Sequence, residues 1–436
     1  VSTTNATTHR FIDYKSGKLK AVAQVTGAYQ QSVHMEGISQ YFLFPGKSQL
    51  LVTGDDVTSD FYTRNIRAEF IGLPSTFQGS FTVNPQQRQE AAFIDFNQDI
   101  SAYWDHELME GSWVTVSIPV VHVENNIQLS EFNVNGNGTA YPNTIAQAFS
   151  QPTYLYAKIC GKNSITQLAD LTIRLGRTFL NSKHNVAAMY TNLVFPSGNK
   201  QNPSYIFSPV AGTDGHFGYG GGTRFQIRLN QDPTNFGLVL FLDLDAVFYA
   251  RNTQKRTYDL IDKPYSRYLP LIKPNSTETI PATNVLTLKT QVHPFTFADF
   301  SCGFRFITAH AELELCYGIW GRGPEQMNLR CNFPQNYGIA GTFDPTTGFI
   351  GTSSQTNIGF LAPNDPEFVA LTINDLDLDS GAGRSAFNNK FQIAVGFWHK
   401  GKLAEIFCAA GTYYDVPMKN SALNLIGAFL KLGASF

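Results

Sequence analysis

The feature that constrains this 436-residue chain most is a period-two alternation of apolar and polar residues, which recurs along most of its length. From Arg224 to Asn230 the sequence reads RFQIRLN, so alternate residues fall on opposite faces of a strand. No segment carries the capped, 3.6-residue apolar stripe of an amphipathic helix. The chain is therefore predicted to be all-β.

The predicted strands are longer than those of most globular proteins. Further alternating segments run over residues 113–121, 168–180, 238–251, 297–307, 311–320 and 390–399. Tilted strands of roughly 9–11 residues cross a hydrocarbon layer, whereas globular strands usually have roughly 5–6 residues. With ~27 residues for each strand and its connection, we predict a transmembrane antiparallel up-and-down β-barrel of about 16 strands, within a range of about 14–18.

The connections between these strands differ in length, as expected for a membrane barrel. A tight link at 308–310 contrasts with long polar stretches at 124–153 and 196–220. Outer-membrane barrels have short periplasmic turns and long extracellular loops. Residues 1–32 alternate poorly and are expected to be a periplasmic extension, a plug or an extra strand, with the barrel over 33–436.

Composition excludes several other classes of protein. Hydrophobic residues make up 43% of the chain and charged residues 15%, which rules out an intrinsically disordered chain. The formal net charge of -2 gives no basic field for phosphates, so no nucleic-acid partner is expected. No apolar stretch is long enough for a membrane-spanning helix. Five cysteines without a CxxC pair signal neither a disulfide framework nor a zinc site, although they leave room for one bridge.

The last segment, ALNLIGAFLKLGASF, is an alternating strand that ends in an aromatic residue. It carries Leu430, Leu432 and Phe436 on one face. This segment resembles the closing strand of Gram-negative outer-membrane β-barrel proteins, in which such an end is the signal for the assembly machinery. The polar residue and the glycine of the family's fuller signal are replaced here by Phe429 and Lys431. The central run of the chain, with NLVFPSGN, resembles uncharacterised outer-membrane barrels of host-dependent bacteria.

The resemblance implies a porin-like barrel in the bacterial outer membrane. Its partners would be the lipid bilayer, lipopolysaccharide and the outer-membrane assembly machinery, and a homo-oligomer stays open. A signal formed by Leu430, Leu432 and Phe436 would direct insertion into the membrane.

Charged side chains indicate which strand faces line the lumen, because an Arg or Lys facing lipid at the bilayer midplane costs ~2–4 kcal/mol. The predicted hairpin register places Arg224 opposite Asp243, Gln226 opposite Phe241 and Arg228 opposite Val239, and it places Arg305 opposite Glu312 or a near neighbour. The expected lumen-lining charges are Arg174, Arg224, Arg228, Asp243, Asp245, Arg305, Glu312, Glu314 and Lys431. Rings of such charges would set ion selectivity; alternatively, they solvate a packed interior.

Other candidate sites carry weaker signals. The acidic run of Asp375, Asp377 and Asp379 departs from a calcium loop, because Ser380 and Ala386 occupy the places of the required glycine and the bidentate glutamate. The adjacent residues 105–107, Asp-His-Glu, lack the i, i+4 spacing of a helical zinc pair. No metal, cofactor or enzymatic activity is therefore expected.

Aromatic residues near strand ends are expected to form girdles at the two membrane interfaces. They are Trp104, Trp113, Trp320, Trp398, Tyr413 and Tyr414.

The expected function is an outer-membrane porin-like channel for passive diffusion of small hydrophilic solutes. One alternative is an outer-membrane transporter for a hydrophobic ligand. Another is a non-conducting structural or surface-lattice barrel. A soluble β-sandwich surface protein is the alternative that lies outside the membrane class.

Overall fold

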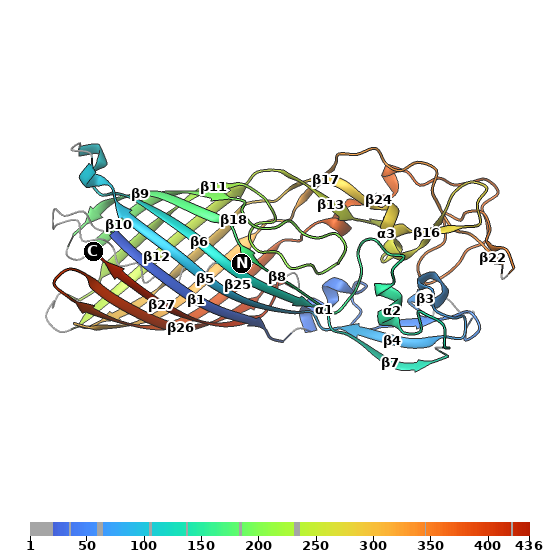
Figure 1. Ribbon diagram of the computed structural model, residues 1–436, viewed down its shortest axis with the longest axis horizontal. Coiled ribbons are helices and arrows are strands. Elements are labelled where there is room, and N and C mark those ends of the chain that lie inside the picture. Colours follow the sequence, from blue (N-terminus) through green and yellow to red (C-terminus); the bar gives the residue numbers. More distant parts are fainter. Residues whose placement is uncertain are drawn as a thin grey trace.

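The structure is a computed structural model that describes residues 21–34, 36–58, 64–103, 107–136, 138–182, 185–230, 236–344, 346–419 and 422–436. It combines long strands that form a barrel with short strands and helices gathered at one end (Figure 1). The N-terminal segment can be followed from Ala21, where the first barrel strand begins. Residues 1–20 lie outside the described part.

A closed antiparallel barrel of twelve strands is the largest unit of the fold. Its sheet closes because β5 pairs with both β1 and β6, while a thirteenth strand, β8, lies outside the ring. The strands in order around the ring are β1 (Ala21–Ser32), β27 (Leu425–Ser435), β26 (Glu405–Pro417), β25 (Ala386–Lys400), β19 (Ala311–Arg322), β18 (Phe297–Ile307), β12 (Gly237–Tyr249), β11 (Gly218–Arg228), β10 (Asn185–Phe195), β9 (Leu171–Asn181), β6 (Ser112–Asn126) and β5 (Gln86–Asp99).

The all-β barrel is confirmed, but the predicted number of about 16 strands is too high. The prediction gave every strand an equal share of connecting residues. In the structure the connections at one end of the barrel are much longer, and they contain short strands of their own. The outside strand β8 (Lys162–Leu168) pairs with the C-terminal part of β6, from Val120 to Asn126. The N-terminal part of β6, from Ser112 to Ser117, pairs with β9.

Apolar side chains cover the outside of the barrel because each strand alternates as its sequence predicts. In β27, Leu430 and Leu432 are 55% and 56% exposed, whereas Lys431 between them is 2% exposed. Exposed apolar residues of the other strands include Val25, Ile94, Phe96, Leu175, Phe179, Met189, Phe225, Leu244, Phe248, Phe304, Leu315, Phe391, Ile393 and Phe397. A closed barrel with an apolar outer belt is built for hydrocarbon. The soluble β-sandwich alternative is therefore wrong.

The two ends of the barrel differ sharply. Short links such as 308–310 and 401–404 lie at one end of the barrel. The first strand, β1, begins at this end, and the last strand, β27, ends there. The long connections 33–85, 250–296 and 323–385 all lie at the other end (Figure 1). Because long loops of outer-membrane barrels are extracellular, we assign this end to the cell exterior.

The long connections fold together into one body, which we call the cap (residues 33–85, 127–170, 196–217, 250–296 and 323–385). Its helices and 3-10 turns are α1 (Glu36–Phe42), η2 (Ala68–Ile71), α2 (Ile145–Ser150), η5 (Ser266–Tyr268), α3 (Ala282–Val285), η6 (Ile373–Asp375) and η7 (Leu378–Gly381). Two further 3-10 turns, η3 (Ser101–Tyr103) and η4 (Glu107–Met109), lie in the β5–β6 link at the other end.

The part of the cap that the structure describes also contains five small sheets. One has four strands, β3 (Ile66–Arg67), β2 (Leu50–Thr53), β4 (Gln78–Val83) and β7 (Leu129–Asn135). Two have three strands, β13 (Asn252–Thr257) with β17 (Thr287–His293) and β20 (Gln326–Leu329), and β16 (Thr279–Pro281) with β15 (Pro270–Ile272) and β21 (Gly338–Ile339). The two-stranded pairs are β14 (Asp259–Leu260) with β24 (Leu376–Asp377) and β22 (Phe343–Asp344) with β23 (Gly348–Phe349).

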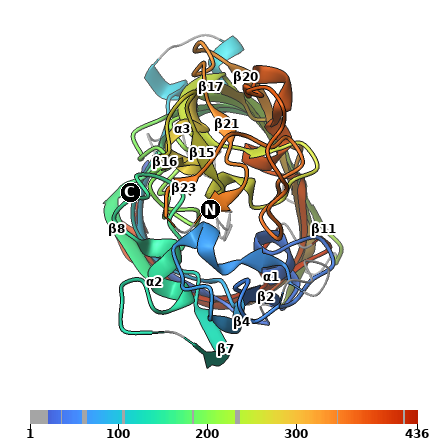
Figure 2. The ribbon, with the colours of Figure 1, turned by 90° about the vertical axis from the view of Figure 1, so that its right-hand side faces the viewer.

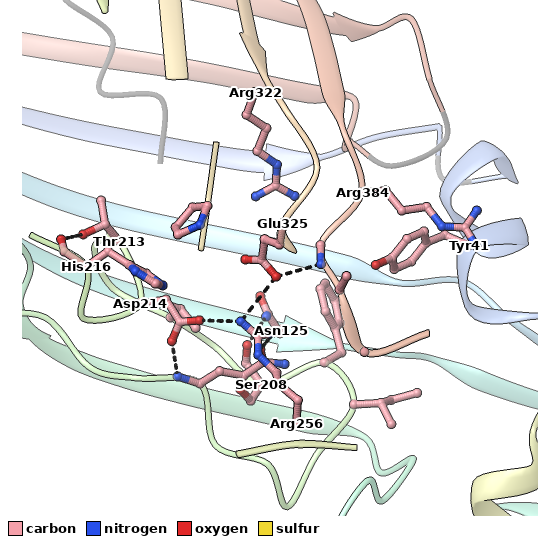
Figure 3. A pocket seen from close by; sticks show the side chains of 18 of the residues that line it. Tyr41, Asn125, Ser208, Thr213, Asp214, His216, Arg256, Arg322, Glu325 and Arg384 are labelled. Carbon is pink, nitrogen blue, oxygen red and sulfur yellow. Dashed lines mark hydrogen bonds and ion pairs between the residues drawn. The ribbon is translucent and has the colours of Figure 1, made fainter. Parts of the chain in front are cut away.

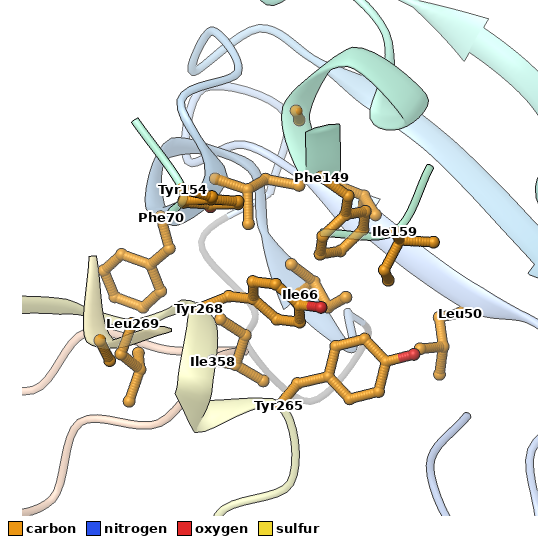
Figure 4. Close-up of a cluster of buried hydrophobic side chains, with 14 of the residues drawn as sticks. Leu50, Ile66, Phe70, Phe149, Tyr154, Ile159, Tyr265, Tyr268, Leu269 and Ile358 are labelled. Carbon is orange, nitrogen blue, oxygen red and sulfur yellow. The ribbon is translucent and has the colours of Figure 1, made fainter. Parts of the chain in front are cut away.

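A hydrophobic core of its own holds the cap together. Residues from separate connections, among them Leu50, Ile66, Phe149, Tyr265, Tyr268 and Ile358, pack into one cluster (Figure 4). The hydroxyl of Tyr268 donates to the carbonyl of Ala157 at 2.7 Å, and Arg64 Nε donates to the carbonyl of Gly359 at 2.6 Å. Seen from its own end, the cap lies over the mouth of the barrel (Figure 2).

The predicted aromatic girdle is largely wrong. Trp113 and Tyr413 are buried and face the barrel interior, where Tyr413 donates to Gln30 at 2.7 Å. Strand parity places Trp320 and Trp398 inside as well. Only Tyr414 of the described set faces outward, and Trp104 lies outside the described residues. The wide interior of a barrel accepts large rings as readily as the interface does, so strand ends alone do not decide which way a ring points.

Candidate functional site

A cavity of about 1100 Å³ lies where the cap meets the mouth of the barrel. Its wall includes the cap-side ends of β9, β12, β18 and β19 and residues from several cap connections. Such a volume is at or above the upper end of the range of ~300–1,000 Å³ that is typical of small-molecule sites. The cavity is therefore large enough for an organic ligand of substantial size.

On the cap side, one arginine ties three cap connections together. Arg256 Nη2 lies 3.0 Å from Asp214 Oδ2 and 3.5 Å from Glu325 Oε2 (Figure 3). Glu325 also accepts the backbone N–H of Gly383 at 2.7 Å. Burial raises the pKa of Asp214, and the guanidinium of Arg256 acts against that rise. Both carboxylates on this side are thus already engaged by the protein.

At the inner end of the cavity, two carboxylates face each other. Asp245 on β12 is directly opposite Asp299 on β18 in the strand register. Asp245 accepts hydrogen bonds at Oδ2 from Tyr190 Oη at 2.8 Å and from Asn192 Nδ2 at 2.6 Å. Asp299 makes no hydrogen bond and no ion pair with any other residue that the structure describes, but it is attracted from a longer distance by Lys390, whose Nζ lies 3.7 Å from Asp415 Oδ1.

The neighbouring strand β19 adds a cation and an aromatic ring to this inner end. Trp320 is directly opposite Asp299 and stacks on Phe297, with ring centroids 5.8 Å apart. Arg322, two residues further along the same face, is exposed and forms no ion pair within the described part of the chain. Its guanidinium points into the cavity above Glu325 (Figure 3).

Below the cavity, charged and aromatic side chains fill the barrel interior. Arg224 Nε is 3.1 Å from Asp243 Oδ1, and Arg305 Nε is 2.7 Å from Glu314 Oε2. Gln392 donates to the other oxygen of Glu314 at 3.1 Å. Around this second pair Phe241, Glu314 and Lys431 are only 1–2% exposed. At this level the side chains of the ion pair and its neighbours are packed together inside the barrel.

All nine predicted lumen-lining charges lie on strand faces that point into the barrel. The predicted register of the β11–β12 hairpin is the one that the structure has, with Arg224 opposite Asp243, Gln226 opposite Phe241 and Arg228 opposite Val239. Arg305 pairs with Glu314, the near neighbour of Glu312.

The remaining members of the set are not gathered into one ring. Arg174 donates to Asn192 at 3.0 Å, and Arg228 lies near the opposite end of the barrel, 3.4 Å from Asn230 Oδ1. Glu312 is opposite Ile307 and Gly396. Their role in ion selectivity remains a prediction, as does that of Leu430, Leu432 and Phe436, which face outward, in assembly.

Sequence reasoning missed several residues of the site. Asp299 alternates in phase with Arg305, and Arg322 with Glu314, so the strand pattern could have identified both. By contrast, the cap connections have no regular alternation of apolar and polar residues. No sequence signal therefore predicts that Arg256, Asp214 and Glu325 meet.

The acidic run near residue 377 has a structural role. Asp377 accepts the backbone N–H groups of Asp379 and Ser380 at the start of η7, and Asp375 accepts that of Thr372. No group of three potential metal ligands occurs among the described residues. Asp105 and His106 of the other acidic cluster lie outside the described residues.

The closed barrel with its apolar belt confirms the expected class, a Gram-negative outer-membrane β-barrel protein. The chain is similar to an outer-membrane channel from Pseudomonas putida F1, with 10% identity, a TM-score of 0.44 and coverage of 97% of this chain and 98% of that chain. It is also similar to a Pseudomonas aeruginosa FadL homologue, with 7% identity, a TM-score of 0.32 and coverage of 96% and 90%.

A third similar structure is the deltaS2S3 mutant of the monoaromatic hydrocarbon channel TodX, with 8% identity, a TM-score of 0.33 and coverage of 96% of this chain and 89% of that chain. No protein-family model matches the sequence, and no curated protein matches it.

Proposed function

We propose that the protein is a substrate-specific outer-membrane channel, in which a ligand binds in the cavity under the cap before it crosses the barrel. The observation that carries this proposal is the order in which the cavity and the packed interior follow each other along the barrel axis. A large cavity at the cap end lies next to a barrel interior in which charged side chains are buried and packed together. Passage then requires the charged groups below the cavity to rearrange.

A passive-diffusion porin accounts less well for this arrangement. Free diffusion of small solutes needs a permanently water-filled lumen, whereas Arg305, Glu314 and Lys431 are packed together inside this barrel. A transporter that binds its ligand fits the packed interior better, and the sequence left open one such alternative, an outer-membrane transporter for a hydrophobic ligand.

The wall of the cavity favours a ligand with both apolar and charged parts. Aromatic side chains, including Tyr41, Phe207, Tyr249 and Trp320, line the same space as the charged residues described above. Aromatic rings bury apolar area, while a few fixed polar groups orient the ligand. A purely hydrophobic ligand remains the second candidate, because these rings alone would suffice to bind it.

Conductance in planar bilayers tests the proposed closure. The native protein is expected to carry little steady current, and the double variant Arg305→Ala/Glu314→Ala is expected to carry a sustained current, because it removes the pair that fills the lumen. Arg88→Ala/Glu90→Ala is the matched control, since that pair lies on the exposed strand face, with its side chains 50% and 48% exposed.

Two outcomes would contradict the proposal. An open-pore current through the native protein would restore the passive porin. A double variant that stays silent, although it is inserted and folded, would favour a non-conducting structural barrel.

A further inference from the structure

The inner end of the cavity carries two charges of opposite sign, and one of them, Asp299, is also attracted by the ammonium of Lys390 inside the barrel. Asp299 and Arg322 both line it, and neither forms an ion pair with the residues that the structure describes. The other acidic groups nearby are engaged, as with Glu325, which binds both Arg256 and Gly383. Both ends of this site are therefore available to a ligand that carries charges of both signs.

We infer that this inner end binds a small zwitterion, an amino acid or a short peptide, through its ammonium and carboxylate groups. The inference rests on the proposed function, because it names the ligand class of the same cavity.

The acidic half of the site suits an ammonium group. Asp245 and Asp299 are directly opposite each other, a position in which side-chain Cβ atoms are ~4.5–5.5 Å apart and like charges are destabilising. Tyr190 and Asn192 both donate to Oδ2 of Asp245, and its Oδ1 has no partner among the described residues. An ammonium has three N–H donors, so one such group can bond to both carboxylates and relieve their repulsion.

A metal ion fits the same place less well. No third Asp, Glu, His or Cys of the described chain completes a ligand set there. The neighbouring donors of Tyr190 and Asn192 already use one oxygen of Asp245. An ammonium needs only hydrogen-bond acceptors, which Asp245 and Asp299 provide.

The basic half of the site suits a carboxylate. Arg322 lies two residues beyond Trp320, the residue opposite Asp299, so Arg322 and Asp299 are diagonal neighbours with Cα atoms ~7–8 Å apart. A guanidinium binds a carboxylate through two parallel hydrogen bonds. The long side chain of Arg322 can therefore reach a carboxylate whose ammonium partner sits between the two aspartates.

Trp320 adjoins both charged ends, since it lies opposite Asp299 and two residues before Arg322, and it offers an apolar surface. Its ring stacks on Phe297 and is thereby fixed in orientation. A ligand held at both ends would lay its apolar part toward this ring and toward the cavity above, whose volume of about 1100 Å³ leaves room for a peptide longer than one residue.

Isothermal titration calorimetry on the full chain in detergent tests the site. The probes are L-phenylalanine and alanyl-phenylalanine, each beside its N-acetyl derivative, which lacks the ammonium, and its methyl ester, which lacks the carboxylate. We expect at least one of the two zwitterions to bind, and each modified form to bind at least tenfold more weakly. The parent probe that binds more tightly distinguishes an amino-acid ligand from a peptide ligand.

Two variants assign the contacts. Asp299→Asn is expected to remove the discrimination against the N-acetyl form and to keep that against the ester. Arg322→Gln is expected to do the reverse. Lys402→Gln, in the exposed turn at the opposite end of the barrel, is the control and should bind like the native protein. Heat-dependent migration on SDS gels confirms that each variant is folded.

The inference is overturned if neither zwitterion binds the native protein, if modified forms bind as tightly as their parents, or if each variant keeps the discrimination it should lose. These outcomes are separate from the bilayer experiment. If the protein binds a zwitterion but no variant conducts, the channel function is refuted and the binding site stands. If the double variant conducts but the native protein binds no zwitterion, the channel function stands and the binding site is refuted.

Discussion

Arg305 and Glu314 form a buried ion pair in the barrel interior. They are 5% and 1% exposed, and the guanidinium of Arg305 also lies over the ring of Phe241, 4.6 Å from its centroid. Two charges buried in this way lose the free energy of their hydration, and their mutual attraction only offsets that loss. Each therefore depends on the other.

Glu314→Ala is expected to destabilise the barrel by about 3–5 kcal/mol, because it leaves the buried charge of Arg305 unpaired. The measurement is the temperature at which the folded band disappears on SDS gels. Replacing both partners by apolar residues of similar volume, as in Arg305→Met/Glu314→Leu, should cost far less.

Glu90→Ala serves as the comparison, since the pair of Glu90 with Arg88 is exposed and such surface pairs contribute little to stability. Equal melting temperatures for Glu314→Ala and Glu90→Ala would show that the interior is wetter than the burial of these residues indicates.

At the scale of single elements, the strands and the cap obey different rules. A barrel strand such as β18 needs only alternation, because one face meets lipid and the other meets the lumen. An element of the cap, such as the helix α2, is defined by its contacts. Its Phe149 packs against Phe81 and Tyr268, which come from two other connections.

Phe149→Ala is expected to weaken the cap by about 3–5 kcal/mol while leaving the barrel intact, because Phe149 belongs to the cap core and to no barrel strand. Limited proteolysis of the purified protein should cut the cap faster, with an unchanged heat-dependent shift of the protected barrel. Leu155→Ala is the control, since Leu155 is 59% exposed in the same connection. A loss of the heat-dependent shift in Phe149→Ala would mean that cap and barrel unfold as one unit.

At the scale of the whole molecule, the arrangement of connections predicts which end faces outward. Five long connections gather on one side of the barrel and fold over its mouth, and short turns close the other side (Figures 1 and 2). Under the proposed function, a ligand from the medium would meet the cap and its cavity before it meets the packed interior.

Epitope tags test this orientation. A tag inserted after Thr277, in the exposed turn between β15 and β16, should bind antibody on intact cells. A tag after Lys402, in the turn between β25 and β26, should bind only after the outer membrane is permeabilised. Surface labelling of the Lys402 tag alone would invert the barrel and place the cavity in the periplasm.

Sequence alone was sufficient to predict which way the charged residues of the barrel wall face and how the β11–β12 hairpin pairs. The period of two predicted which face of β12 carries Asp243 and Asp245, and hairpin geometry predicted the pairing of Arg224 with Asp243. These predictions succeed because a strand in a membrane barrel has only two environments, and the energetic cost of a charge in lipid makes them easy to distinguish.

Tertiary structure alone decided the number of strands, the cap and the ligand cavity. Leu50, Phe149 and Tyr268 meet in one core although they come from three separate connections, and Asp214, Arg256 and Glu325 meet in the same way at the cavity wall. Contacts of this kind join residues that are far apart in the chain, and no periodic pattern in the sequence predicts them. Their partners are set by how the barrel brings its long connections together, and that arrangement exists only once the ring has closed.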